Sequence, residues 1–136
     1  MLIMTKETLL IGGKMKRILV LDDHEKWHML AERDTACIAG CSIDHAYTLN
    51  QAMDLLKTSS YSLIVSDINL NMSIPDSKEG LYFIKYLRES GSKTPVICVT
   101  SGKCLESIIL QAGADKLVAK SEFYPGFIKA VEEYLK

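Results

Sequence analysis

The stretch YSLIVSDIN, residues 61–69, contains an apolar run that ends on a carboxylate, Asp67. Residues 63–65 show no polar alternation, which suits a strand buried on both faces of a parallel sheet, although a buried helix fits the same pattern. At the carboxyl end of such a strand, Asp67 would face the crevice in which open α/β sheets bind ligands. An Asp in this position more often opens a turn or caps a helix, so the rest of the chain must decide.

Three other short apolar runs also end on reactive or charged side chains. The run ILVLDD, residues 18–23, ends on Asp22 and Asp23. The run VICVTS, residues 96–101, reaches Thr100, and KLVAK, residues 116–120, ends on Lys120. Because the carboxyl ends of parallel strands meet at one edge of a sheet, these side chains are expected to lie together.

Helical patterns separate these runs from one another and from a weaker strand at residues 41–47. Five alternations of strand and helix predict βαβ crossovers, which are right-handed, and a parallel sheet covered on both faces. We therefore expect an α/β, flavodoxin-like (βα)5 fold: a doubly wound, five-stranded parallel sheet of order 2-1-3-4-5. Its switch point lies between the first and third strands, which end on Asp22, Asp23 and Asp67.

Length and composition limit the function. The 136 residues suit one domain, predicted at 16–136, after an N-terminal extension at 1–15. The 16 basic and 17 acidic residues leave no basic footprint for nucleic acid. The first eleven residues are too short and too interrupted to span a membrane. The four cysteines lack zinc-type pairing and no secretory leader is evident, so we expect a cytoplasmic protein with reduced thiols.

Carboxylates gathered at one crevice repel each other, so such a cluster normally holds a cation or shifts a pKa. An all-oxygen site with open positions suits Mg²⁺. An Asp such as Asp67 can attack phosphorus if the charge of the transferred group is neutralised, and Lys120 could supply a cation there while Thr100 donates a hydrogen bond. Taken singly, each side chain could instead be a helix cap or a solvated charge.

The set of motifs resembles the receiver domains of two-component response regulators, from about Lys16 to Lys136. The resemblance implies that Asp67 is the phosphoacceptor and that Asp22 and Asp23 hold Mg²⁺, with the backbone carbonyl of Asn69 as a further ligand. It also implies that Thr100 and Lys120 contact the phosphoryl group, and that the donor is a phosphohistidine on a sensor histidine kinase or a histidine phosphotransfer protein. The matching pieces are ILVLDD (18–23), LIVSD (63–67), VICVTS (96–101), GAD (113–115) and VAK (118–120).

The chain departs from the family pattern at two positions. Ser121 follows Lys120 where receivers usually have Pro, and Leu117 stands where an aromatic residue is common. The loop at residues 69–80 is also longer than usual, and we expect it to overhang the site. These departures keep open a second interpretation, in which the receiver fold is a binding module that works without phosphorylation. A phosphatase of the haloacid dehalogenase type expects its nucleophile in the first strand, with an acid two residues later, where this chain has His24.

The expected function is a stand-alone, phosphorylation-switched signalling domain. It would not be a conventional enzyme, but it would catalyse its own phosphorylation and dephosphorylation. Its downstream partner is expected to bind the face formed by the fourth and fifth helices with the strand between them. His24 and His28 are interpreted as a solvated helix face, and Tyr82, Phe83 and Tyr86 as packing residues.

Overall fold

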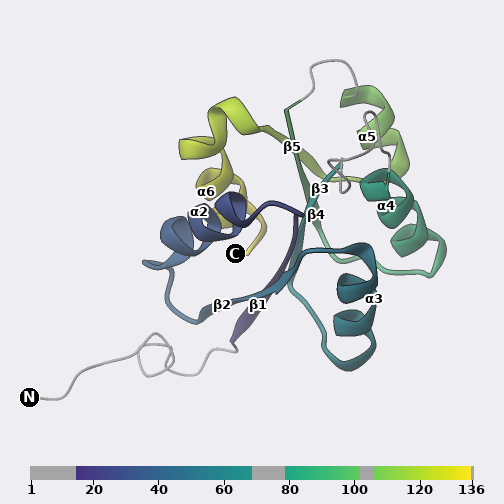
Figure 1. Cartoon of the computed structure of the whole chain (residues 1–136), viewed down its shortest axis with the longest axis horizontal. Helices are drawn as coiled ribbons and strands as arrows, with labels where there is room; N and C mark the ends of the chain where they lie inside the picture. Colours follow the sequence, from purple (N-terminus) through teal and green to yellow (C-terminus); the bar gives the residue numbers. More distant parts are fainter. Residues whose placement is uncertain (1–14, 69–78, 102–105, 136) are drawn as a thin grey trace, which may run out of the picture.

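The computed structural model describes residues 15–68, 79–101 and 106–135 (Figure 1). Within these residues, five strands form one sheet in the order β2-β1-β3-β4-β5, and every neighbouring pair is parallel. The predicted flavodoxin-like order is therefore confirmed. Apart from Met15, the expected N-terminal extension lies outside the described residues. The strands are β1 (Lys16–Leu21), β2 (Cys41–Ala46), β3 (Leu63–Asp67), β4 (Val96–Thr100) and β5 (Lys116–Ala119).

Helices cover both faces of this sheet (Figure 1). One face carries α2 (Glu25–Thr35) and α6 (Phe123–Tyr134), and the other carries α3 (Leu49–Thr58), α4 (Glu79–Glu89) and α5 (Glu106–Ala112). A short 3-10 helix, η1 (Lys120–Glu122), joins β5 to α6. No helix of the described ranges has the length and apolar character needed to cross a membrane.

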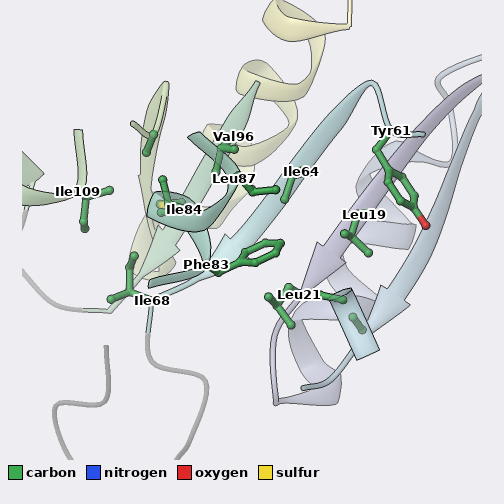
Figure 2. Packing of buried hydrophobic residues seen from close by; sticks show 14 residues of the cluster. Leu19, Leu21, Tyr61, Ile64, Ile68, Phe83, Ile84, Leu87, Val96 and Ile109 are labelled. Atoms are coloured by element: carbon green, nitrogen blue, oxygen red, sulfur yellow. The ribbon is translucent and has the colours of Figure 1, made fainter. Parts of the chain in front are cut away.

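The central strands are buried on both faces, as their continuous apolar runs predict. In β1, Ile18 and Val20 belong to the core beneath α2 and α6, whereas Leu19 and Leu21 belong to the core beneath the other three helices. Figure 2 shows the latter cluster, in which Phe83 of α4 packs among strand residues. Burying a large apolar side chain contributes about 1.5–3 kcal/mol, so these two layers hold the sheet edge that carries the polar side chains.

Most helix boundaries follow the sequence signals. Thr48 caps α3, accepting a hydrogen bond from the Gln51 amide at 3.1 Å, and Gly113 follows α5 with a φ of 121°. One expectation was wrong: α4 begins at Glu79, so Gly80 is helical and not part of the loop. Helix α2 ends at Thr35.

Candidate functional site

Three carboxylates meet at the carboxyl edge of the sheet. Asp22 and Asp23 follow β1, and Asp67 is the last residue of the neighbouring strand β3. One oxygen from each lies within 4.8 Å of the others. Asp22 and Asp67 are buried, at 3% and 6% exposure, and Asp23 is half-buried. The structure thus brings together the three acids at the predicted switch point.

Lys120 reaches into this cluster from the first residue of η1. Its Nζ lies 3.2 Å from Oδ2 of Asp22 and 3.2 Å from Oδ2 of Asp67, and its side chain is only 14% exposed. Removing charges from water is costly unless they are paired, so one ammonium bridging two carboxylates stabilises all three. The position of Lys120 places a cation at the oxygens of the residue predicted to react.

The electrostatics of Asp22 reflect its burial. Burial raises the pKa of its carboxyl above the usual value, and the charge of Asp23 raises it further. Lys120 and a hydrogen bond from the His24 amide, 2.9 Å from Oδ1, act in the opposite direction without cancelling the effect. Ionising Asp22 is therefore costly in the absence of another cation, and a bound cation would favour the charged form.

Gly80 lets the first turn of α4 approach the reacting end of β3. Its amide donates a hydrogen bond to the Ile68 carbonyl at 3.0 Å. A Cβ at this position would lie 2.0 Å from the backbone oxygen of Asp67, which real contacts do not allow. Glycine at position 80 is therefore required for the observed distance between α4 and Asp67.

Of the remaining predicted site residues, the structure describes Thr100 but not Asn69. Thr100 is buried and ends β4, one residue beyond Val99, which pairs with Asp67 in the sheet. Asn69 and most of the long loop lie outside the described residues. Of the two departures from the family pattern, Ser121 is exposed in η1, and Leu117 is partly buried in β5.

Two aromatic side chains that the sequence analysis did not predict for the site, those of Trp27 and Phe123, lie beside the acids. Trp27 of α2 has its ring centroid 4.8 Å from the Nζ of Lys120 and 5.3 Å from the ring of Phe123. Both aromatic residues, together with Asp22 and Asp67, line a cavity of about 10 Å³. A cation over an indole face is attracted by the ring, so Trp27 helps to hold Lys120 in place. The available signal was that Trp27 lies one helical turn after Asp23.

His28 contradicts its interpretation as part of a solvated helix face. Its side chain is 1% exposed, and its Nε2 lies 2.7 Å from the backbone oxygen of Asp22. The tyrosines of α4 are more exposed than the packing role predicted for them, since Tyr82 is 70% and Tyr86 is 49% exposed. Phe83 is buried, as expected.

Comparison with known proteins identifies the family. Residues 18–132 match the model of the response regulator receiver domain. This match covers most of the chain, which therefore belongs to the receiver domains of two-component response regulators. The strand order and the acidic edge described above are consistent with that assignment.

Three relatives illustrate the likeness. The transcriptional regulatory protein DltR of Streptococcus agalactiae is 31% identical over 108 residues, which cover 76% of this chain and 45% of DltR. The chain thus spans about half the length of this relative. Response regulator TrrA of Thermotoga maritima, crystallised in complex with Mg(2+)-BeF, is 26% identical with a TM-score of 0.72, over 88% of this chain and 99% of that one. A Burkholderia pseudomallei response regulator with a phosphorylated aspartic acid, calcium ion and citrate shares the fold, at 23% identity and a TM-score of 0.69, over 89% and 66% of the two chains.

Proposed function

We propose that this receiver domain accepts a phosphoryl group on Asp67 from a phosphohistidine of a sensor histidine kinase or histidine phosphotransfer protein. The observation that carries the proposal is the position of Asp67. Its carboxylate is buried at the end of a central strand, within 4.8 Å of oxygens from Asp22 and Asp23 and 3.2 Å from the Nζ of Lys120. The proposed setting is the cytoplasm, where such kinases present their phosphohistidine.

The donor set fits Mg²⁺. Three carboxylate oxygens lie close enough to share an ion, and the burial that raises the pKa of Asp22 makes a divalent cation a favourable partner. Asp22, Asp23 and Asp67 would hold the ion, with the carbonyl of Asn69 proposed as a further ligand. When bound, Mg²⁺ would neutralise charge on the phosphoryl oxygens. In TrrA and in the Burkholderia protein, a cation accompanies a phosphoryl mimic or a phosphorylated aspartate.

The chain's own residues then have defined tasks. A carboxylate oxygen of Asp67 attacks phosphorus, the phosphorus–nitrogen bond breaks, and the imidazole nitrogen keeps the electron pair and takes a proton. Lys120 lies beside that carboxylate and can exchange its contact with Asp67 for a contact with a phosphoryl oxygen. The hydroxyl of Thr100 donates a hydrogen bond to another oxygen. Attack by water on phosphorus reverses the modification and returns Asp67 as a carboxylate.

The proposed output is a shift between two conformations. Pulling Thr100 and Lys120 toward a phosphoryl group would move the ends of β4 and η1, which adjoin α5, β5 and α6. We therefore propose that a downstream protein reads the α5-β5-α6 face. Partly buried Leu117 of β5 stands where the family often has an aromatic switch, so the movement here would depend on backbone shifts.

The test is intact-mass analysis after incubation with Mg²⁺ and a small-molecule phosphodonor such as acetyl phosphate. We expect one phosphoryl adduct in the wild type and none in Asp67→Asn or in the presence of EDTA. The matched control is Asp115→Asn, which removes a carboxylate at the other edge of the sheet and should still be modified. A wild type that binds Mg²⁺ but forms no adduct would contradict the proposal and favour a binding module that works without phosphorylation.

A further inference from the structure

A chain of hydrogen-bonding groups on the β2 side of α2 contains two histidines. His28 of α2 places Nε2 2.7 Å from the backbone oxygen of Asp22 and Nδ1 2.7 Å from Nδ1 of His45 in β2. The other nitrogen of His45, Nε2, lies 2.8 Å from a carboxylate oxygen of Glu32. The proposed phosphorylation site uses neither imidazole.

The outer partners determine where the protons lie. The carbonyl of Asp22 and the carboxylate of Glu32 can only accept, so both Nε2 atoms must donate. With its proton on Nε2, a neutral His28 ring would present a lone pair at Nδ1. A neutral His45 would likewise present a lone pair at Nδ1. The two Nδ1 atoms lie 2.7 Å apart, which is the distance of a hydrogen bond, so a proton lies between them in the metal-free protein and a bound metal would replace that proton.

This arrangement is the one that histidine metal ligands usually have. A ligating imidazole typically donates its second N–H to a carboxylate or a backbone carbonyl, which fixes the tautomer and turns the other nitrogen toward the ion. Glu32 provides such an acceptor for His45, and the Asp22 carbonyl provides one for His28. Both hydrogen-bond acceptors are already in place.

The surroundings leave room for an ion and its remaining ligands. A hollow of about 510 Å³ is bordered by both histidines, by Glu25 and Glu32 of α2, and by Tyr47, together with Met29 and Arg33. Zn–N bonds near 2.0–2.1 Å in a tetrahedron place two nitrogens about 3.3 Å apart, so the rings must separate by roughly half an ångström. The His45 side chain is 25% exposed and can make that movement.

The charges around the hollow favour a cation. Glu25, whose carboxylate raises the pKa of the Tyr47 hydroxyl through a hydrogen bond, and Glu32 both border it. Arg33 is the opposing charge among the lining residues, but its guanidinium pairs with Asp34 at 2.9 Å. Water or Glu25 can fill the remaining coordination positions.

We propose that the Nδ1 atoms of His28 and His45 form a second cation site, which takes a divalent transition metal of the zinc or copper class. Imidazole nitrogen prefers these ions, whereas the all-oxygen cluster at Asp22, Asp23 and Asp67 suits Mg²⁺. The same His28 ring donates a hydrogen bond to the Asp22 carbonyl. Metal binding at the histidine site would therefore also affect this hydrogen bond to the backbone of the acidic cluster. The proposal stands on the histidine geometry and does not depend on phosphorylation of Asp67.

The direct test is a Zn²⁺ titration followed by long-range ¹H–¹⁵N NMR of the imidazole rings, in excess Mg²⁺ to occupy the acidic cluster. We expect the Nδ1 resonances of His28 and His45 to shift while both rings keep Nε2 protonated. His24, the third histidine of the chain, should not respond. This readout separates imidazole coordination from metal held by thiols or carboxylates.

Two variants quantify the site without replacing buried His28. His45→Gln should weaken Zn²⁺ binding by at least about tenfold, and Glu32→Gln should weaken it by about tenfold, because a neutral amide makes the His45 ring a weaker base than a carboxylate does. His24→Gln is the matched control and should bind as the wild type does. Equal affinity in His45→Gln and wild type, or Nδ1 resonances that respond to pH but not to Zn²⁺, would overturn the proposal in favour of a shared proton.

Discussion

Opposite edges of the sheet each carry a carboxylate system, buried at the carboxyl edge and exposed at the amino edge, and the two are built differently. At the amino edge, Asp115 precedes β5 and its Oδ2 accepts hydrogen bonds from Arg88 at 2.9 Å and from the Val96 amide at 2.8 Å. Arg88 also donates to the carbonyls of Gly113, Ser92 and Thr94. At this edge, the folded chain supplies hydrogen-bond donors to a single carboxylate.

At the carboxyl edge, three acids gather around Lys120 within 4.8 Å of one another. Burial of charge and repulsion between like charges both oppose folding here, and the raised pKa of Asp22 results mainly from its burial and to a lesser extent from Asp23. The comparison indicates that the amino-edge carboxylate stabilises loops, whereas the carboxyl-edge cluster is arranged for a ligand that the fold does not supply. Neutralising a charged side chain should therefore lower stability at the amino edge and raise it at the carboxyl edge.

The largest effect is expected from Arg88→Met, which keeps an unbranched apolar stem but removes the guanidinium donors at the amino edge. Four carbonyl or carboxylate partners lose a hydrogen bond, each contributing about 0.5–1.5 kcal/mol, so the free energy of unfolding should fall by about 2–6 kcal/mol. Urea unfolding monitored by circular dichroism measures this loss. A change below about 0.5 kcal/mol would mean that the Arg88 network contributes little to stability.

The next largest effect concerns the support of the carboxyl edge. Gly80→Ala places a Cβ against the Asp67 carbonyl, so α4 must move away from the end of β3. We expect a loss of about 1–3 kcal/mol, as for other overpacked sites, together with slower phosphorylation of Asp67. Gly126→Ala in α6 is the control, because its added Cβ would meet only a Val118 methyl at 3.4 Å. Equal stability of the two variants would contradict this role of Gly80.

A smaller effect of opposite sign is expected from Asp22→Asn. The folded protein holds a proton on Asp22 at a higher pH than an unfolded chain does, so ionisation of Asp22 lowers stability as pH rises from the ordinary Asp range through the raised pKa. Metal-free Asp22→Asn should lack this decline and be more stable at pH 7 by about 1 kcal/mol, because the neutral amide avoids the cost of burying a charge, which is the main cause of the raised pKa.

Urea unfolding in EDTA between pH 4 and pH 8 measures the difference between Asp22→Asn and wild type. The gap in unfolding free energy should widen as pH rises. A gap that is constant across this range, or a variant less stable than wild type at pH 7, would show that Lys120 fully compensates for the burial of Asp22.

The fold was predictable because its signals are local. Continuous apolar runs identify buried parallel strands, and the rule that sites form at their carboxyl ends placed Asp22, Asp23 and Asp67 together before any coordinates were known. The helix ends at Thr48 and Gly113 have equally local signals, because capping and positive φ depend on the residues adjacent to the helix end.

The missed features depend on contacts between residues distant in sequence. His28 was interpreted as part of a solvated face shared with His24, yet its partners are a backbone carbonyl and a histidine of strand β2. Trp27 meets Phe123 only because α2 and α6 cover the same face of the sheet (Figure 1). Gly80 was assigned to the loop from the sequence. The close approach to Asp67 that requires glycine there is visible only in three dimensions.

The most direct test of the difference between the two edges is a Mg²⁺ titration followed by the fluorescence of Trp27, the one tryptophan in the chain, which lines the same small cavity as Asp22 and Asp67. We predict a saturable change in the wild type and in Asp115→Asn, and its loss in Asp22→Asn and Asp23→Asn. Mg²⁺ binding that survives both substitutions at the carboxyl edge, or that is lost in Asp115→Asn while the protein stays folded, would contradict the account.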